Sequence, residues 1–178
     1  LKKEGYSIVR MQDLNSDGQK KAVESFAKSV PSNGVAFFYF IGLGANLERQ
    51  GRHYNLLRPV KEKIQSDNDY RSRSLNVPDI IKTFNTFSGA RVNLLFLDAC
   101  WKSPILPEKG KINGGLRAFE PEGDTLVMFG AGSLKLQSVP KGNTPSVMAN
   151  ALAQNMSRLE VSLKEMVDAV TSATKQGW

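Results

Sequence analysis

The sequence predicts an α/β domain in which a mostly parallel central sheet is flanked by helices. Two short, almost continuous apolar runs carry this prediction, residues 35–40 and 93–97, because such runs suit strands that are buried on both faces of a parallel sheet. A helix-length segment separates them, and alternating helices and strands are typical of this class. Binding and active sites of open α/β sheets lie at strand ends, so the turns that follow the two runs are the first candidates for a site.

Length and composition are those of one globular domain that spans residues 1–178, with 40% hydrophobic residues. Cys100 is the only cysteine, so no internal disulfide supports the fold. No run approaches the roughly 18 apolar residues of a membrane span, and the N-terminus does not resemble a signal peptide. We therefore expect a soluble, cytoplasmic protein without membrane contact. The net charge is +7, and the basic residues are scattered along the chain among acidic ones. This distribution favours a solvated basic surface over nucleic-acid binding.

The part of the chain before the first apolar run predicts two helical segments and a strand. Leu1–Gly5 looks like the end of a helix with a C-cap glycine, and Tyr6–Arg10 like a short strand. Residues 15–18 offer turn and N-cap chemistry for a helix over Gln19–Val30, where apolar residues recur at helical spacing. Residues 31–34 should end that helix before the strand.

The rest of the chain alternates between predicted loops and regular elements. The loops, which are polar, charged or rich in Pro and Gly, are predicted at residues 46–52, 66–73, 102–115 and 133–145. We expect the loop over 102–115 to be exposed. The regular elements are a helix from Ile80 to Phe87, a strand over 124–130 and amphipathic helices from Ser146 to about Leu163 and from there toward Lys175.

The two apolar runs end in short motifs, Gly42-Leu43-Gly44 and Asp98-Ala99-Cys100. With these motifs the chain resembles the caspase-like cysteine peptidases of the peptidase C14 type, especially the prokaryotic branch related to metacaspases, which carry Ser-Gly-His-Gly and Asp-Ala-Cys there. Further matches are Gly51, Tyr54, Pro59, Gly115 and Leu116. The resemblance covers nearly the whole chain and implies the three-layer caspase-hemoglobinase fold. It also implies that the first strand and most of the first helix of that fold are not represented after Leu1.

The resemblance assigns roles to residues at both strand ends. Cys100 takes the position of the nucleophile, and Leu43 the position of the catalytic histidine. The backbone amide of Gly44 would contribute to the oxyanion hole, although glycine also simply permits a tight turn. Asp98 matches the carboxylate that selects Arg or Lys in the substrate pocket, and it could instead be a structural hydrogen-bond acceptor. A second pocket acid is expected at Gln137, which is not acidic.

The functional prediction follows from Leu43, because leucine can neither activate a thiol nor protonate a leaving amine. We predict a caspase-like pseudo-protease that binds or regulates a protein or peptide. One alternative is an active Arg/Lys-directed cysteine endopeptidase with another base, or an inactive variant of one; His53, the only histidine, is expected at the surface or in packing. The third hypothesis is a basic module that binds anions or nucleic acid. No cofactor or metal is expected, since a lone Cys and a lone His make a poor ligand set, and Leu47 takes the place of the third glycine of a dinucleotide fingerprint.

Overall fold

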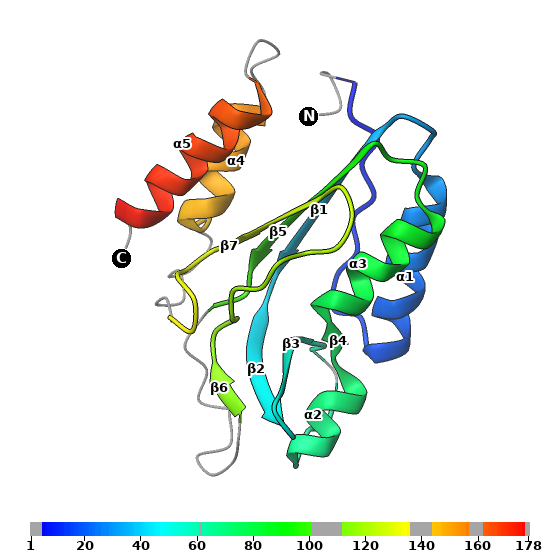
Figure 1. Ribbon diagram of the computed structural model, residues 1–178, viewed down its shortest axis with the longest axis vertical. Coiled ribbons are helices and arrows are strands. Elements are labelled where there is room, and N and C mark those ends of the chain that lie inside the picture. Colours follow the sequence, from blue (N-terminus) through cyan, green and yellow to red (C-terminus); the bar gives the residue numbers. More distant parts are fainter. Residues whose placement is uncertain (1–4, 61, 101–111, 136–143, 157–161, 177–178) are drawn as a thin grey trace.

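The computed structural model of the protein describes residues 5–60, 62–100, 112–135, 144–156 and 162–176. In chain order, the helices and strands are α1 (Ser16–Ser29), β1 (Val35–Ile41), β2 (Leu43–Arg49), β3 (Arg52–Arg58), α2 (Asp67–Arg73), β4 (Leu75–Asn76), α3 (Val77–Phe87), β5 (Val92–Asp98), β6 (Ile112–Gly114), β7 (Thr125–Phe129), α4 (Val147–Met156) and α5 (Leu163–Gln176). Figure 1 shows their arrangement.

The predicted parallel sheet is confirmed and has the strand order β1-β5-β7. Both pairs of neighbouring strands in this sheet are parallel. The register pairs Val35 with Val92 and Ile41 with Asp98 at the two ends of β1 and β5. β5 is the central strand, which accounts for the near-continuous apolar run in its sequence. Because β1 and β5 end in register, the motifs that follow them leave the sheet at the same edge.

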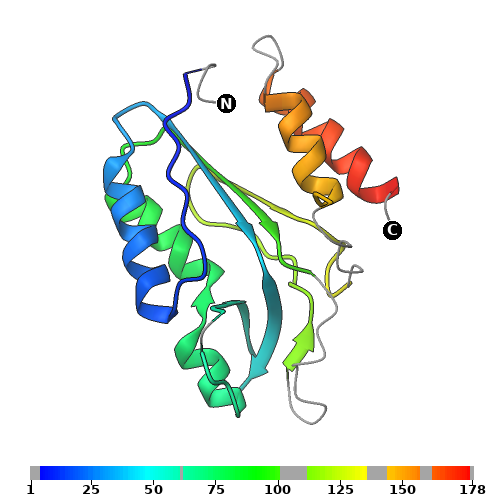
Figure 2. The same cartoon turned by 180° about the vertical axis from the view of Figure 1, so that it is seen from behind.

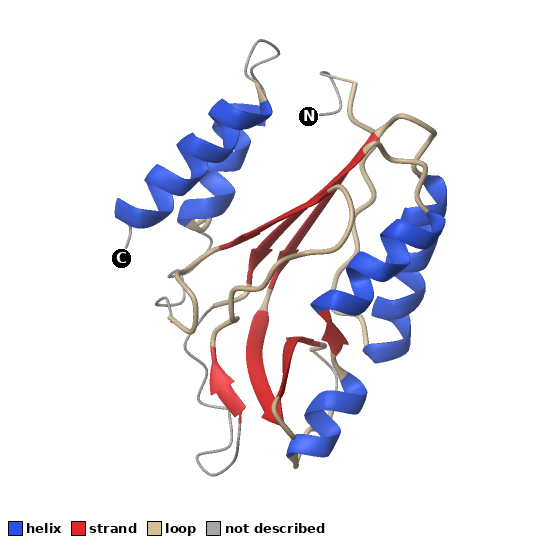
Figure 3. Cartoon of the chain, in the orientation of Figure 1, coloured by secondary structure: helices blue, strands red, loops and turns tan. Residues whose placement is uncertain are grey.

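Helices cover both faces of this sheet, which gives the three layers that were predicted (Figures 1 and 3). Side chains of β5 alternate between the faces. Leu94 and Phe96 pack with α4 and α5, whereas Leu95 and Leu97 pack with α1 and α3. The reverse view in Figure 2 again shows the α4–α5 pair and the α1–α3 pair on opposite sides. Among the described residues, no helix is long and apolar enough to cross a bilayer.

A second, antiparallel sheet of strand order β4-β3-β2-β6 was not predicted. The expected polar loop over 46–52 is wrong, because this segment is largely the β2–β3 hairpin. Its turn has positive φ at both central residues, 53° at Gln50 and 73° at Gly51, the backbone geometry that suits two-residue hairpins. The hairpin has polar residues at buried positions, Asn46 and Asn55. The polar composition of residues 46–52 therefore does not indicate a loop.

Three further expectations are corrected. Residues 66–73 are not a loop, because Ser66 caps α2 by accepting a hydrogen bond from the Asp69 backbone amide at 3.1 Å. Tyr6–Arg10 does not form a strand and is exposed. Part of the predicted 102–115 loop is β6, whose Ile112 is buried; residues 102–111 of that loop lie outside the described residues.

The predicted helices are otherwise confirmed. Asn15 caps α1 by accepting a hydrogen bond from the Gly18 backbone amide, and α3 covers the expected Ile80–Phe87 segment. The helix expected from Ser146 ends at Met156 in its described part, and α5 follows from Leu163. The expected helix end at Leu1–Gly5 and the middle of the 133–145 loop lie outside the described residues, apart from Gly5 and the loop's two ends.

Candidate functional site

The structure brings the two sequence motifs together at one edge of the parallel sheet. The Gly42 backbone amide donates to the Asp98 carbonyl oxygen at 3.2 Å. A Cβ atom on Gly44 would lie 2.6 Å from the Ala99 carbonyl oxygen and 2.9 Å from the Ala99 Cβ, so only glycine permits this approach. Leu43 is therefore held between two residues that contact the Asp98–Ala99 turn, and its own side chain is half-buried.

Cys100 is fully buried and lies in the core cluster that includes Leu57, Leu116 and Ala131. Burial raises the pKa of its thiol, and the charge of Asp98 adds to this, whereas hydrogen bonds from the backbone amides of Leu116 and Ala131 act in the opposite direction. The thiol of Cys100 therefore has a raised pKa and is not accessible to solvent. Neither property suits a nucleophile at neutral pH.

Asp98 is also fully buried, and two hydroxyl groups bind its carboxylate. Tyr39 donates to Oδ2 at 2.9 Å, and Ser146 donates to the same oxygen. The Ser146 hydroxyl also accepts a hydrogen bond from the Ala149 backbone amide at 3.0 Å, in the first turn of α4. Burial and the neighbouring Asp98 raise the pKa of Tyr39. Asp98 thus links the end of β5 to β1 and to α4, which is the structural role considered above; its role in substrate binding stays a prediction.

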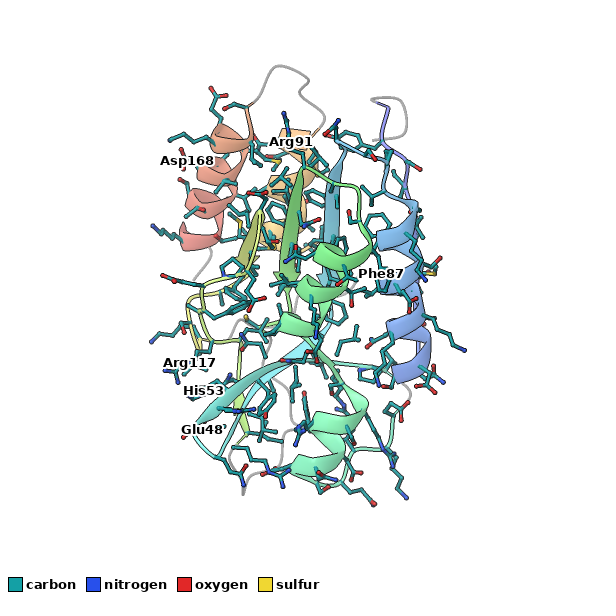
Figure 4. The ribbon with its side chains drawn as sticks, turned by 45° about the vertical axis from the view of Figure 1, so that its right-hand side comes forward. Glu48, His53, Phe87, Arg91, Arg117 and Asp168 are labelled. Carbon is teal, nitrogen blue, oxygen red and sulfur yellow. The ribbon has the colours of Figure 1, made fainter. Side chains whose placement is uncertain are left out.

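His53 lies on the exposed part of β3 and is engaged with other residues (Figure 4). Its Nε2 atom lies 2.7 Å from an Arg117 guanidinium nitrogen, and its Nδ1 atom lies 3.2 Å from Asn46 Oδ1. Cys100 is not among its hydrogen-bond partners. Gln137, the expected second pocket residue, lies outside the described residues.

Two hollows flank the segments that contact Cys100, and Cys100 lines neither. One, of about 190 Å³, includes Arg117, the residue after Leu116. The other, of about 310 Å³, lies between β7 and α5 and includes Ala131. Within the described ranges, no group of three or more His, Cys, Asp and Glu side chains could hold a metal ion.

Several residues that shape the site lie outside every pattern recognised in the sequence. Tyr39 and Ser146 meet Asp98 across 59 and 48 positions of the chain, and neither lies in a motif. Arg117 is likewise distant from Asn55, to which its backbone is bound. A prediction of the β2–β3 hairpin would have identified Asn55 as a polar residue at a buried strand position.

A parallel sheet between two helical layers, with a cysteine after the central strand and paired glycines after its neighbour, defines the class of caspase-like α/β proteins. The sequence matches the family model described as "Caspase domain" (peptidase C14) over residues 1–176, and the chain belongs to this family. No curated protein matches the chain significantly.

The buried thiol leads to an expected pH dependence of stability. Because the folded state raises the pKa of Cys100 above its ordinary value near 9, the folded protein holds this proton more tightly than the unfolded chain. The contribution is complete below that value and is lost as pH rises, with a limiting slope of about 1.4 kcal/mol per pH unit. Urea unfolding between pH 8 and 10 should show this decrease. Cys100→Ala should lack it, and an identical pH dependence in both proteins would contradict the burial of the thiol; the tyrosines Tyr39 and Tyr70, whose pKa values are also raised, act only above about pH 10.

Proposed function

We propose that this chain is a catalytically impaired caspase-family domain that binds or regulates a protein or peptide. The observation that carries the proposal is Leu43, which stands between Gly42 and Gly44 at the position of the family histidine. Its backbone is held beside the Asp98–Ala99 turn. An aliphatic side chain there supplies neither the general base nor the general acid that amide cleavage needs.

The state of Cys100 supports the same proposal. A buried thiol with a raised pKa is a poor nucleophile, since the thiolate is the reactive form. His53 does not compensate, because both of its ring nitrogens are engaged with Asn46 and Arg117. Tyr39 does not either, because its hydroxyl is bound to Asp98 and its raised pKa keeps it protonated.

The rate at which Cys100 reacts with iodoacetamide tests this proposal. Cys100 is the only thiol, so the reaction reports on one site. We expect alkylation of the folded protein to be on the order of a hundredfold slower than in urea, because a buried thiol reacts only after local opening and because its thiolate fraction is low. A rate in the folded protein that matches the unfolded chain would overturn the proposal in favour of an active peptidase with another base.

A matched pair of variants separates the effect of residue 43 from that of burial. Leu43→His introduces an imidazole beside the strand end, and Leu43→Gln introduces a polar group of similar size without a base. Alkylation should begin at lower pH in Leu43→His than in Leu43→Gln, because an imidazole beside the sulfur promotes formation of the thiolate. Equal pH profiles for the two variants would show that residue 43 does not face the sulfur.

A further inference from the structure

The pocket of about 190 Å³ is separate from the residues at the ends of β1 and β5. Its lining comes from β3, the first turn of α3 and the segment after β6, namely His53, Asn55, Pro78, Arg117, Ala118 and Phe119. Neither Leu43 nor Cys100 lines it. The pocket is smaller than most sites for whole small molecules, which occupy roughly 300–1,000 Å³. Its size suits a single side chain.

The main chain at Arg117 is fixed by a buried asparagine. The Asn55 side-chain amide donates to the Arg117 carbonyl oxygen at 2.7 Å, and the Arg117 backbone amide donates to Asn55 Oδ1 at 2.8 Å. Asn55 is itself buried and accepts a hydrogen bond from Asn46 at 3.2 Å. These bonds involve only the backbone of Arg117, so a change of its side chain leaves the attachment intact.

The guanidinium group of Arg117 is positioned by His53. One guanidinium nitrogen lies 2.7 Å from Nε2 and 3.3 Å from Nδ1 of the imidazole. The Nδ1 atom also lies 3.2 Å from Asn46 Oδ1. Asn46 is buried and also bound to Asn55. The chain from Asn55 through Asn46 and His53 to Arg117 therefore orients the arginine before any ligand arrives.

The positive charge of Arg117 is not neutralised within the part of the chain that the structure describes. None of the salt bridges found there involves Arg117. Glu48 is the nearest acid by strand pairing, because it lies directly opposite His53 in the β2–β3 hairpin. Figure 4 shows Glu48, His53 and Arg117 in the same region, but Glu48 forms no ion pair there with Arg117. Guanidinium N–H groups beyond the one used by His53 remain to bind an anion.

We propose that this pocket binds the carboxylate of an acidic peptide side chain. The planar fork of arginine matches a carboxylate, and Pro78, Ala118 and Phe119 offer an apolar wall for the aliphatic stem of a Glu or Asp residue. A single cation beside an apolar wall is a poor match for a multiply charged phosphate. The inference goes beyond the proposed function, since it does not depend on the reactivity of Cys100.

His53 provides the measurement, because the only histidine of the chain gives one unambiguous imidazole signal in NMR spectra. The probe is an N-acetylated and C-amidated peptide, Ala-Ala-Glu-Ala-Ala, beside the same peptide with Gln in place of Glu. We expect the Glu peptide to shift the His53 signal in a saturable way and the Gln peptide to leave it unchanged. Equal shifts with both peptides would overturn the proposal, as would a saturable response to inorganic phosphate without one to the Glu peptide.

Variants of Arg117 and of Glu48 test the role of each charge. Arg117→Gln should weaken binding of the Glu peptide about tenfold, the size of one lost charge-assisted hydrogen bond. Arg117→Lys should retain part of the affinity, and it covers the case in which Arg117→Gln disturbs the fold. Glu48→Gln should strengthen binding several-fold, because it removes a negative charge opposite His53 that repels the carboxylate of the peptide. Unchanged affinity in both Arg117 variants would refute the assignment.

Discussion

Fluorogenic peptides with Arg, Lys or Asp before the scissile bond should show no hydrolysis that depends on Cys100. Amide cleavage requires a thiolate for the attack and a proton for the departing amine, and one histidine normally serves both steps. Leu43 serves neither. In another hydrolase, removal of the catalytic histidine lowered turnover by about six decades, and we expect a deficit of that order relative to a caspase-family enzyme with its histidine. Stabilisation of an oxyanion by backbone amides would not replace proton transfer.

The measurement compares the protein with Cys100→Ala over the whole peptide panel. Identical residual rates in the two proteins are the expected result, because any remaining hydrolysis then comes from elsewhere. Turnover that disappears in Cys100→Ala would instead show an active peptidase and would require another base near the sulfur. Leu43→His is the positive test, since recovery of Cys100-dependent turnover would show that one substitution disables an otherwise complete site.

The parallel sheet could be predicted because its strands are apolar on both faces, as in β5, where Leu94 and Leu95 face opposite helical layers. The antiparallel sheet could not, because it buries polar residues. Asn46 donates to Asn55, and Asn55 donates to the backbone of Arg117. Such hydrogen bonds leave no periodic pattern in the sequence. For α2, the acids and serines that cap and start a short helix were mistaken for loop composition.

The candidate site shows the same division. That Gly44 would meet the Ala99 turn follows from two parallel strands ending in register. The burial of Cys100 and the partners of Asp98 do not follow, because they depend on Leu116, Ala131 and Ser146, which come from later segments of the chain. A motif therefore places a residue at a strand end, whereas its reactivity is determined by contacts that no local pattern contains.

Asp98→Ala should lower the free energy of unfolding by about 3 kcal/mol. The carboxylate accepts hydrogen bonds from Tyr39 and Ser146 while fully buried. Each bond to a charged group contributes about 1.5–3 kcal/mol, and the substitution leaves the hydroxyl groups without this acceptor. Urea unfolding measures the loss, and an unchanged m-value would show that the change lies in stability rather than in the compactness of the unfolded state.

Two further variants show whether the loss arises from this network or from the cavity that the substitution leaves. Tyr39→Phe removes one hydroxyl and should cost about 1.5 kcal/mol. In the double variant with Asp98→Ala, that cost should largely vanish, because the two residues contact each other directly. A group kept for substrate binding would behave differently, since buried charges at binding sites are commonly a burden on stability. A stable Asp98→Ala protein would therefore count against the structural role and return Asp98 to the substrate pocket.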